Sequence, residues 1–212
     1  MPEALFGLRV IEIGVGPVTG MVGMILADFG AEVLRVKSPF ERPLDALNAA
    51  PMWGRGKRDL TLALEKRVDR EALRELIPCV DVLVTNCRRK ALKRWALYSE
   101  EIRAEFSHLI YCHVSGFGSK GALADIPGYE HVVAAYAGRM MMFQGLTDRD
   151  GPAFSSVQVG VHVATQAAIV GIIAARLEQL NSGNGRLIET SILQGMLPYE
   201  MGGLIARQFL ES

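Results

Sequence analysis

Residues 8–37 read LRVIEIGVGPVTGMVGMILADFGAEVLRVK, and this stretch decides the fold. The short apolar run Leu8–Ile13, partly β-branched, is typical of a buried strand. A glycine-containing turn follows it, and Met21–Phe29 then predicts a helix that Gly30 ends. Glu32–Lys37 predicts a second strand. A strand, a helix and a strand in this order favour parallel pairing in an α/β domain.

The same alternation continues towards the C-terminus. We expect further strands at Leu60–Leu64 (an edge strand), Val80–Thr85, Leu109–Val114 and Arg186–Ile192. We expect helices at Asp69–Ile77, from Ser99, at Val132–Met141, at Val163–Leu180, and from the last strand to the C-terminus. The helix 163–180 is small and apolar on most faces, so it should be buried. No linker divides the chain, which predicts one Rossmann-like domain over residues 1–212: a parallel sheet with flanking helices.

Composition argues against several classes of function. Lys plus Arg and Asp plus Glu each number 23, and this neutral balance disfavours a general nucleic-acid or membrane-surface role. The longest apolar run, Ala167–Ala175, is shorter than a bilayer span, and the N-terminus lacks a signal-peptide pattern. The cysteines Cys79, Cys87 and Cys112 form no CxxC pair. We therefore expect no metal site, and reduced thiols in a cytoplasmic protein.

The glycines after the first strand suit a phosphate better than a dinucleotide. Gly14, Gly16 and Gly20 are spaced GxGxxxG, whereas dinucleotide folds use GxGxxG. A dinucleotide site also needs an acid near the end of the second strand, where this chain has Lys37. NAD binding is therefore disfavoured. The alternative is that these glycines only allow the helix to pack closely on the strand.

Three basic clusters are predicted to follow strands. They are Arg35 with Lys37, Arg55 with Lys57 and Arg58, and the run Arg88-Arg89-Lys90 with Lys93 and Arg94. Ligands of open α/β sheets bind at the carboxyl ends of the strands. Each cluster alone would be an ordinary solvated surface. Three of them at one sheet edge of a neutral protein favour a polyphosphate ligand.

Seven segments together resemble the class III CoA-transferases, a family that includes formyl-CoA and crotonobetainyl-CoA transferases and the α-methylacyl-CoA racemases. In chain order they are LFGLRVIEIG, ILADFGAEVLRV, GRGKRDLTLAL, DVLVTNCRRKALKR, LIYCHVSGFGSKG, PGYEHVVAAYAG and GIIAARLEQLNSGNGRLIE. The resemblance covers essentially the whole chain. It implies the Rossmann-like fold and a CoA thioester as ligand or substrate, with no permanently bound cofactor.

The resemblance also implies which residues contact CoA. They are Asn86, Cys87, Arg88 and Arg94, with Lys57 and Arg58 nearby, Lys37 beside the second strand, and Tyr129 in the later loop. One departure is Ser38, which stands where the family often has a CoA-binding arginine. Lys37 is adjacent to it, but its side chain should point to the other face of the strand.

A second departure concerns the chemistry. The family transfers CoA through an aspartate that attacks the acyl-CoA thioester, and this aspartate follows a glycine just before a long helix. The ungapped match puts Gly160-Val161 on that pair, and no acid lies between Gly151 and Leu177. The racemases use a His-Asp pair where this chain has Tyr129-Glu130, so racemase activity is not expected.

Three readings of function remain at this point. The leading one is a CoA- or acyl-CoA-binding domain without its own covalent chemistry, working as half of a longer or tandem enzyme or as a partner subunit. The second is an active CoA-transferase that uses Glu130, against which stands the simpler role of Glu130 as a helix cap or ion-pair partner. The third is a non-catalytic structural subunit. We expect a homodimer or association with a full-length homologue.

Overall fold

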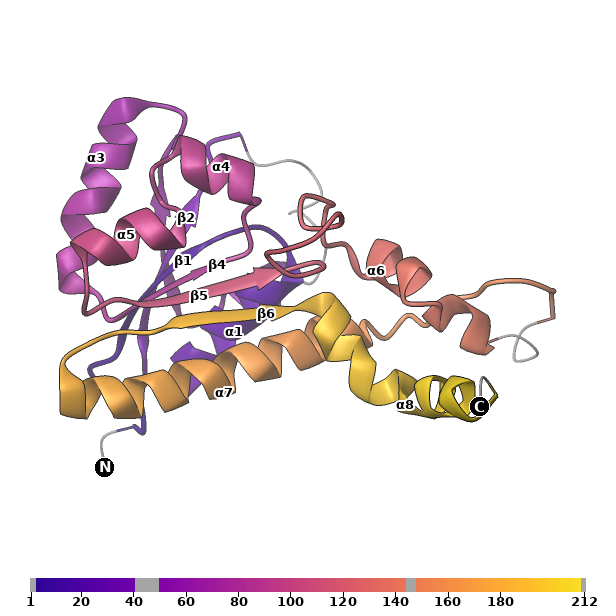
Figure 1. Ribbon diagram of the computed structural model, residues 1–212. Coiled ribbons are helices and arrows are strands. Elements are labelled where there is room, and N and C mark those ends of the chain that lie inside the picture. The colour runs from indigo at the N-terminus through magenta and orange to yellow at the C-terminus, as the bar shows by residue number, and fades with distance from the viewer. Residues whose placement is uncertain (1–2, 41–49, 144–147, 211–212) are drawn as a thin grey trace.

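Six parallel strands form the sheet that carries the site (Figure 1). The computed structural model describes residues 3–40, 50–143 and 148–210. The sheet order is β3-β2-β1-β4-β5-β6, so the chain direction across the sheet reverses between β1 and β4. The strands are β1 Arg9–Ile13, β2 Glu32–Lys37, β3 Lys57–Thr61, β4 Val82–Thr85, β5 Ile110–Ser115 and β6 Leu187–Ser191. The α/β class and the parallel sheet are thus confirmed.

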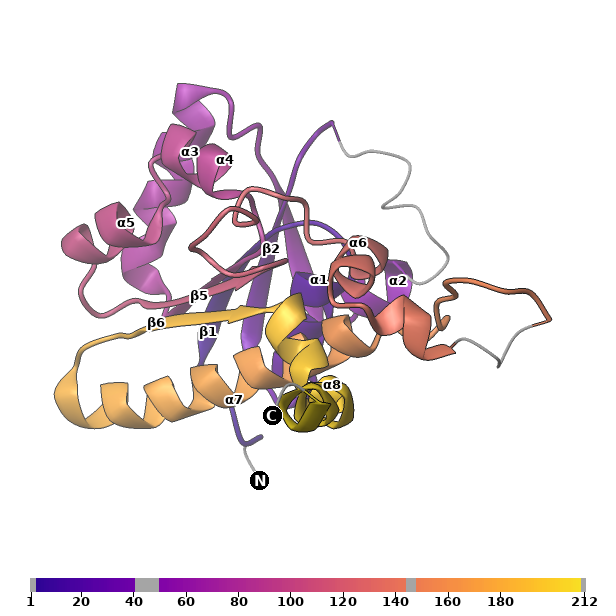
Figure 2. The same ribbon diagram turned by 45° about the vertical axis from the view of Figure 1, so that its right-hand side comes forward.

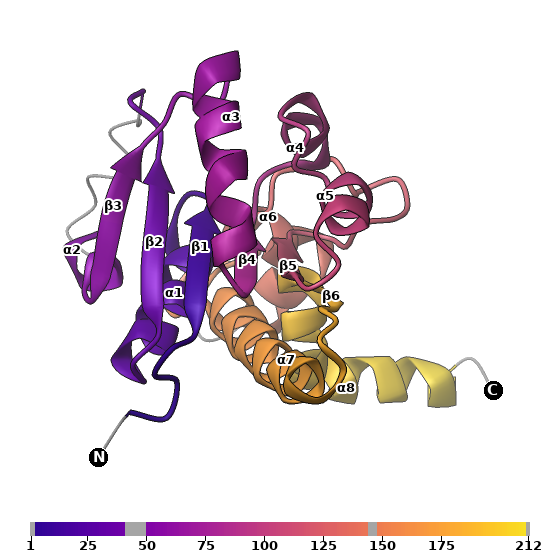
Figure 3. The same cartoon turned by 90° about the vertical axis from the view of Figure 1, so that its left-hand side faces the viewer.

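Helices cover both faces of the sheet (Figures 1 and 3). α1 and α7 pack on one face, over a core of small and aliphatic side chains. α3, α4 and α5 pack on the other, over a second core that includes Leu73, Leu92 and Ile102. The helices are α1 Pro17–Asp28, α2 Ala50–Gly54, α3 Arg67–Leu76, α4 Arg89–Arg94, α5 Ser99–Glu105, α6 Glu130–Tyr136, α7 Val159–Ser182 and α8 Ile192–Leu210, with 3-10 turns η2 Ile77–Cys79 and η3 Arg139–Phe143.

Element boundaries differ from the predictions where a local signal competes with periodicity. α1 begins at Pro17 rather than Met21, because proline suits the first turn of a helix and Gly16 supplies a positive φ of 77° before it. The helix predicted at 132–141 is two pieces, α6 and η3, separated at Gly138, whose φ is 75°. α2 and α4 are short and were not predicted.

The position of β3 corrects one functional expectation. β3 is an edge strand, as predicted, but it begins at Lys57 rather than Leu60. Lys57 and Arg58 pair in register with Val33 and Leu34, near the start of β2. The prediction that the cluster at 55–58 follows a strand on the ligand edge is therefore wrong, since this cluster lies at the amino end of its strand.

α7 runs along the whole sheet, and only one side of it is buried. Ala164, Ala168 and Ile172 lie under the sheet, whereas Val170 and Leu177 are 67% and 62% exposed. The expectation that this helix is buried is wrong for that outer side. By length and composition alone α7 would be able to cross a bilayer, but this is weak evidence for a membrane span because a core helix meets the same test.

The N-terminus of α7 crosses α8 at close range. A side chain on Gly195 would meet the carbonyl oxygen of Gly160 at 2.6 Å, and one on Gly160 would meet Ile192 and Met196 at 2.7 Å. Glycine at both positions lets the two backbones approach. Beyond this crossing, α6, η3 and α8 extend from one end of the sheet as an arm (Figures 1 and 2).

Candidate functional site

Asn86 joins the carboxyl ends of β1 and β4, where the chain direction across the sheet reverses. Its side-chain oxygen accepts a hydrogen bond from the Val15 N–H at 3.1 Å, and its Nδ2 donates to the Val15 carbonyl at 2.7 Å. A side chain on Gly14 would overlap Asn86 Oδ1. Both polar atoms of the Asn86 side chain therefore hold the loop between β1 and α1, and Gly14 is needed for that contact.

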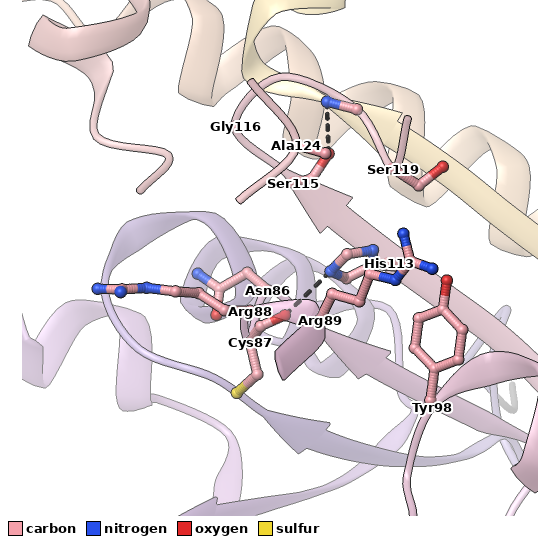
Figure 4. Close-up of a pocket in the computed structure, with 11 residues that line it drawn as sticks. Asn86, Cys87, Arg88, Arg89, Tyr98, His113, Ser115, Gly116, Ser119 and Ala124 are labelled. Atoms are coloured by element: carbon pink, nitrogen blue, oxygen red, sulfur yellow. Dashed lines mark hydrogen bonds between the residues drawn. The ribbon is translucent and has the colours of Figure 1, made fainter. Parts of the chain in front are cut away.

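A pocket opens at the carboxyl ends of β4 and β5 (Figure 4). Arg88 extends to one side of it, next to Asn86, and Arg89 extends to the other, towards His113 and Tyr98. Open parallel sheets bind ligands at this edge, beside the point where strand order reverses. The pocket is lined by Asn86, Cys87, Arg88, Arg89, Tyr98, His113, Ser115, Gly116, Gly118, Ser119 and Ala124.

The Cys87 sulfur does not face this pocket (Figure 4). Its Sγ donates to the Ile13 carbonyl at 3.7 Å, and burial raises the pKa of the thiol. Cys87 is thus neither a reactive thiolate nor a side-chain ligand donor, and its backbone lines the pocket instead. His113 Nε2 lies 3.1 Å from the Cys87 carbonyl and donates this hydrogen bond, because a carbonyl oxygen can only accept. Burial lowers the His113 pKa and so favours the neutral ring.

Most of the predicted cations are already neutralised. Lys37 pairs with Asp59 at 2.7 Å, Arg58 pairs with Glu32 at 3.1 Å, and Arg94 pairs with Glu65. Arg88, Arg89, Lys90 and Lys93 differ: within the described ranges these four form no ion pair with any carboxylate. The unpaired positive charge of this sheet edge is therefore concentrated beside the pocket.

Lys57 is the predicted contact residue that the fold buries most deeply. Its side chain is 0% exposed, and its Nζ lies 2.5 Å from Glu12 Oε2 and 2.8 Å from the Gly20 carbonyl. Burial lowers the Lys57 pKa and raises the Glu12 pKa, while each charge partly offsets the effect on the other. The prediction that Lys57 contacts CoA does not fit this geometry, because the ammonium is enclosed beneath α1.

Glu130 lies on the face of the sheet that α1 and α7 cover, and its carboxylate caps the N-terminus of α7. Its Oε1 accepts the Gly160 N–H at 2.9 Å and its Oε2 accepts the Val161 N–H at 2.8 Å. The side chain is buried, and a carboxylate at this position also suits the positive end of the α7 dipole. Glu130 is indeed a cap, but of α7, which begins 29 residues later, rather than of its own helix.

Val161 occupies an apolar site. It is 2% exposed and belongs to the core cluster that also holds Val18, Val133 and Met196. Within the described residues no acid side chain other than Glu130 is hydrogen-bonded to this helix terminus. The side chain at position 161, where the family motif has its nucleophile, is therefore part of the hydrophobic core.

Tyr129, which was predicted to contact CoA, follows a close contact between two loops but is not among the residues that line the pocket. Gly116 and Gly128 approach so closely that a side chain on either would overlap the backbone of the other. Tyr129 is 59% exposed, next to the buried Glu130. His131 faces away and packs edge-on against Phe154, with ring centres 4.5 Å apart.

Sequence reasoning missed part of the pocket lining. Tyr98, His113, Ser115 and Ser119 were not chosen, although the motif Ser115-Gly-Phe-Gly118 ends a predicted strand and would have indicated this edge. Tyr98 carried no such signal, because it reaches the pocket only through the packing of α4 and α5.

Comparison with known proteins identifies the family to which a chain with this fold and site belongs. The chain belongs to CoA-transferase family III, whose profile matches residues 5–207. It is similar to succinyl-CoA–D-citramalate CoA-transferase of Chloroflexus aurantiacus, at 30% identity over 92% of this chain and 51% of that protein. It is also similar to human alpha-methylacyl-CoA racemase, at 31% identity over 91% of this chain and 49% of that protein.

Solved structures agree with this assignment. A CAIB/BAIF family protein from Brucella suis superposes with a TM-score of 0.84 at 26% identity, covering 97% of this chain and 58% of that one. A hypothetical protein from Mycobacterium tuberculosis has a TM-score of 0.88 at 22% identity, covering 97% of this chain and 59% of that one, and supports the fold alone. The chain spans about half the length of the curated relatives it matches.

Proposed function

We propose that this chain binds coenzyme A or a CoA thioester at the carboxyl edge of its sheet. The observation that carries the proposal is the group of four unpaired cations, Arg88, Arg89, Lys90 and Lys93, beside the pocket of a chain with net charge zero. Phosphates of the CoA nucleotide supply the anions that such a cluster lacks, and arginine binds phosphate in bidentate fashion. Similarity to CoA-transferases supports the same ligand.

We propose further that these residues bind the ligand without forming an acyl-enzyme themselves. Covalent transfer needs a nucleophile that can reach the thioester carbon. Val161 has none, and Glu130 has both oxygens engaged by backbone N–H groups. A Glu130 nucleophile would have to give up two hydrogen bonds that cap α7, which argues against the second reading of function.

The exposed apolar side chains of the arm favour association with a partner chain. The arm and the loop before α7 carry exposed apolar side chains, including Met141, Met142 and Tyr199 on the arm and Phe154 in the loop, each at least 50% exposed. We propose that this end associates with a second copy or with a longer homologue. Sedimentation equilibrium and co-purification would test this, since a strictly monomeric chain with no homologue bound would contradict it.

Calorimetric titration of CoA into the intact chain tests the binding proposal. We expect Arg88→Ala to weaken binding roughly 10-fold or more, as for loss of a charged hydrogen bond. Arg186→Ala is the matched control, because Arg186 is a cation at the opposite sheet edge, paired with Glu178. Absence of CoA binding by the unmodified chain would overturn the proposal and leave the structural role. A hydroxamate on Glu130, formed when hydroxylamine attacks a glutamyl-CoA thioester and releases CoA after incubation with acyl-CoA, would favour the transferase reading.

A further inference from the structure

The two edge strands of the sheet, β3 and β6, are attached to the fold in different ways (Figure 3). β3 reads KRDLT, with three charged residues, and its single apolar residue, Leu60, is only partly buried. β6 reads LIETS, with one charged residue, and its last two residues, Thr190 and Ser191, are buried. Ile188 of β6 also packs against α7 at Gly171. Apolar packing therefore helps to hold β6, whereas β3 has little of it.

Ion pairs fasten residues 55–61, which comprise β3 and the two residues before it, to α1, β1 and β2. Every charged residue of this segment is paired: Arg55 with Asp28 at 2.5 Å, Lys57 with Glu12 at 2.5 Å, Arg58 with Glu32 at 3.1 Å, and Asp59 with Arg35 at 2.8 Å and with Lys37 at 2.7 Å. In four of these five pairs the side chains are between 21% and 76% exposed. The attachment of this edge is therefore largely electrostatic and largely in contact with water.

The fifth pair, between Lys57 and Glu12, is buried, but it does not resist opening as an apolar core would. Burial lowers the Lys57 pKa and raises the Glu12 pKa, because each charge loses hydration in the folded state. Both charges regain water when the segment lifts away from α1, so the cost of their desolvation is recovered. Opening of the segment 55–61 therefore exposes charges that water solvates well and little apolar surface.

We propose that residues 55–61 form a strap that opens locally while the rest of the sheet stays folded, and that ionic strength sets how often it opens. Regions with few buried apolar contacts open at a low free-energy cost. The screening length of salt falls from about 10 Å at 0.1 M to about 3 Å at 1 M, so the four exposed ion pairs weaken as salt rises. The apolar attachment of β6 does not weaken in this way. This inference does not depend on the proposed binding of CoA.

Hydrogen–deuterium exchange of the full chain at constant pH tests the strap. Peptides covering 57–61 report on β3, and peptides covering 187–191 report on β6. Raising NaCl from about 0.1 M to about 1 M should speed exchange in β3 roughly 10-fold and change exchange in β6 by less than about 2-fold. β1 should stay protected at both salt concentrations, because the sheet does not unfold. An equal response of the two edges, no response in β3, or loss of protection in β1 together with β3 would overturn the proposal.

A pair of matched substitutions separates the ion pairs from charge in general. Asp59→Asn keeps the shape of the side chain and removes two ion pairs, so at low salt it should speed exchange in β3 roughly 10-fold and reduce the response to salt. Glu189→Gln removes a charge on β6 that has no ion-pair partner in the described part of the chain, and it should change neither edge.

Denaturant titration verifies that each variant is folded. If Asp59→Asn does not fold, Arg55→Gln replaces it, because it removes one exposed pair with α1 and should give a smaller rise in the same peptides. Unchanged exchange in β3 in the folded variant, or an unchanged response to salt, would show that ion pairs do not hold the strap.

Discussion

The carboxylate of Glu130 accepts the backbone N–H of Val161 at 2.8 Å, while the Val161 side chain points into apolar core. The second oxygen accepts the neighbouring Gly160 N–H at 2.9 Å. An acid at 130 therefore stabilises the helix terminus at which relatives with the family motif are expected to keep their nucleophile. In this chain the two positions form a structural contact, and their substitution should affect stability first.

Glu130→Gln should lower the free energy of unfolding by about 1–3 kcal/mol. The amide keeps one acceptor oxygen, but its NH₂ group would face a backbone N–H that then has no acceptor. Denaturant titration measures the change. Asp125→Asn, on an exposed acid in the preceding loop, removes the same charge without a cap and should have little effect. An equal effect of the two substitutions would argue that charge rather than capping matters.

Val161→Asp should be destabilising by at least about 3 kcal/mol, because it buries a carboxylate without a cationic partner beside Glu130. Val161→Thr has nearly the same shape and no charge, so it separates the cost of charge from that of shape. The penalty of the aspartate should shrink as the pH falls from 8 towards the unfolded Asp pKa of about 3.9, since the folded state favours the neutral acid. A pH-independent penalty would contradict this account.

The buried Glu12–Lys57 pair provides a third prediction. Glu12→Gln or Lys57→Met alone should cost about 3–5 kcal/mol, because each leaves one buried charge unpaired. The double variant should recover much of that loss, and this coupling is measured by a double-mutant cycle. Arg58→Met is the neighbouring control. The Arg58 and Glu32 side chains are 76% and 57% exposed, so their ion pair should contribute at most about 1 kcal/mol. Additive single effects at 12 and 57 would rule out a coupled pair.

His113 should make stability depend on pH. Burial lowers its pKa in the folded state below the ordinary 6.5, so the unfolded chain binds a proton more readily. The contribution of neutral His113 is fully present above pH 6.5 and is lost as the pH falls towards the lowered folded pKa. The slope from this group is at most about 1.4 kcal/mol per pH unit.

Comparison with His113→Asn between pH 7.5 and 5 isolates this slope, which should be reduced in the variant. His131→Asn is the matched control, because it makes the same substitution at an exposed histidine outside the buried core. An unchanged slope in His113→Asn would exclude His113 as its source.

The sequence by itself determined the α/β class, the order of the strands along the chain, most helices, and the loop and basic run that border the pocket. These follow from local physics: apolar periodicity, glycine and proline at element ends, and the rule that parallel strands expose their carboxyl ends together. The sequence also shows that position 161 has no nucleophilic side chain, because this depends only on the residue type.

Only the tertiary structure decided what individual charges do. Lys57 is basic in sequence, but it lies beneath α1 because Glu12, from a strand two positions away in the sheet, pairs with it. Glu130 caps a helix that begins 29 residues later, and Tyr98 reaches the pocket through helix packing. The physical reason is the same in each case. Whether a charge is buried, paired or free depends on long-range contacts, and local sequence patterns do not specify those contacts.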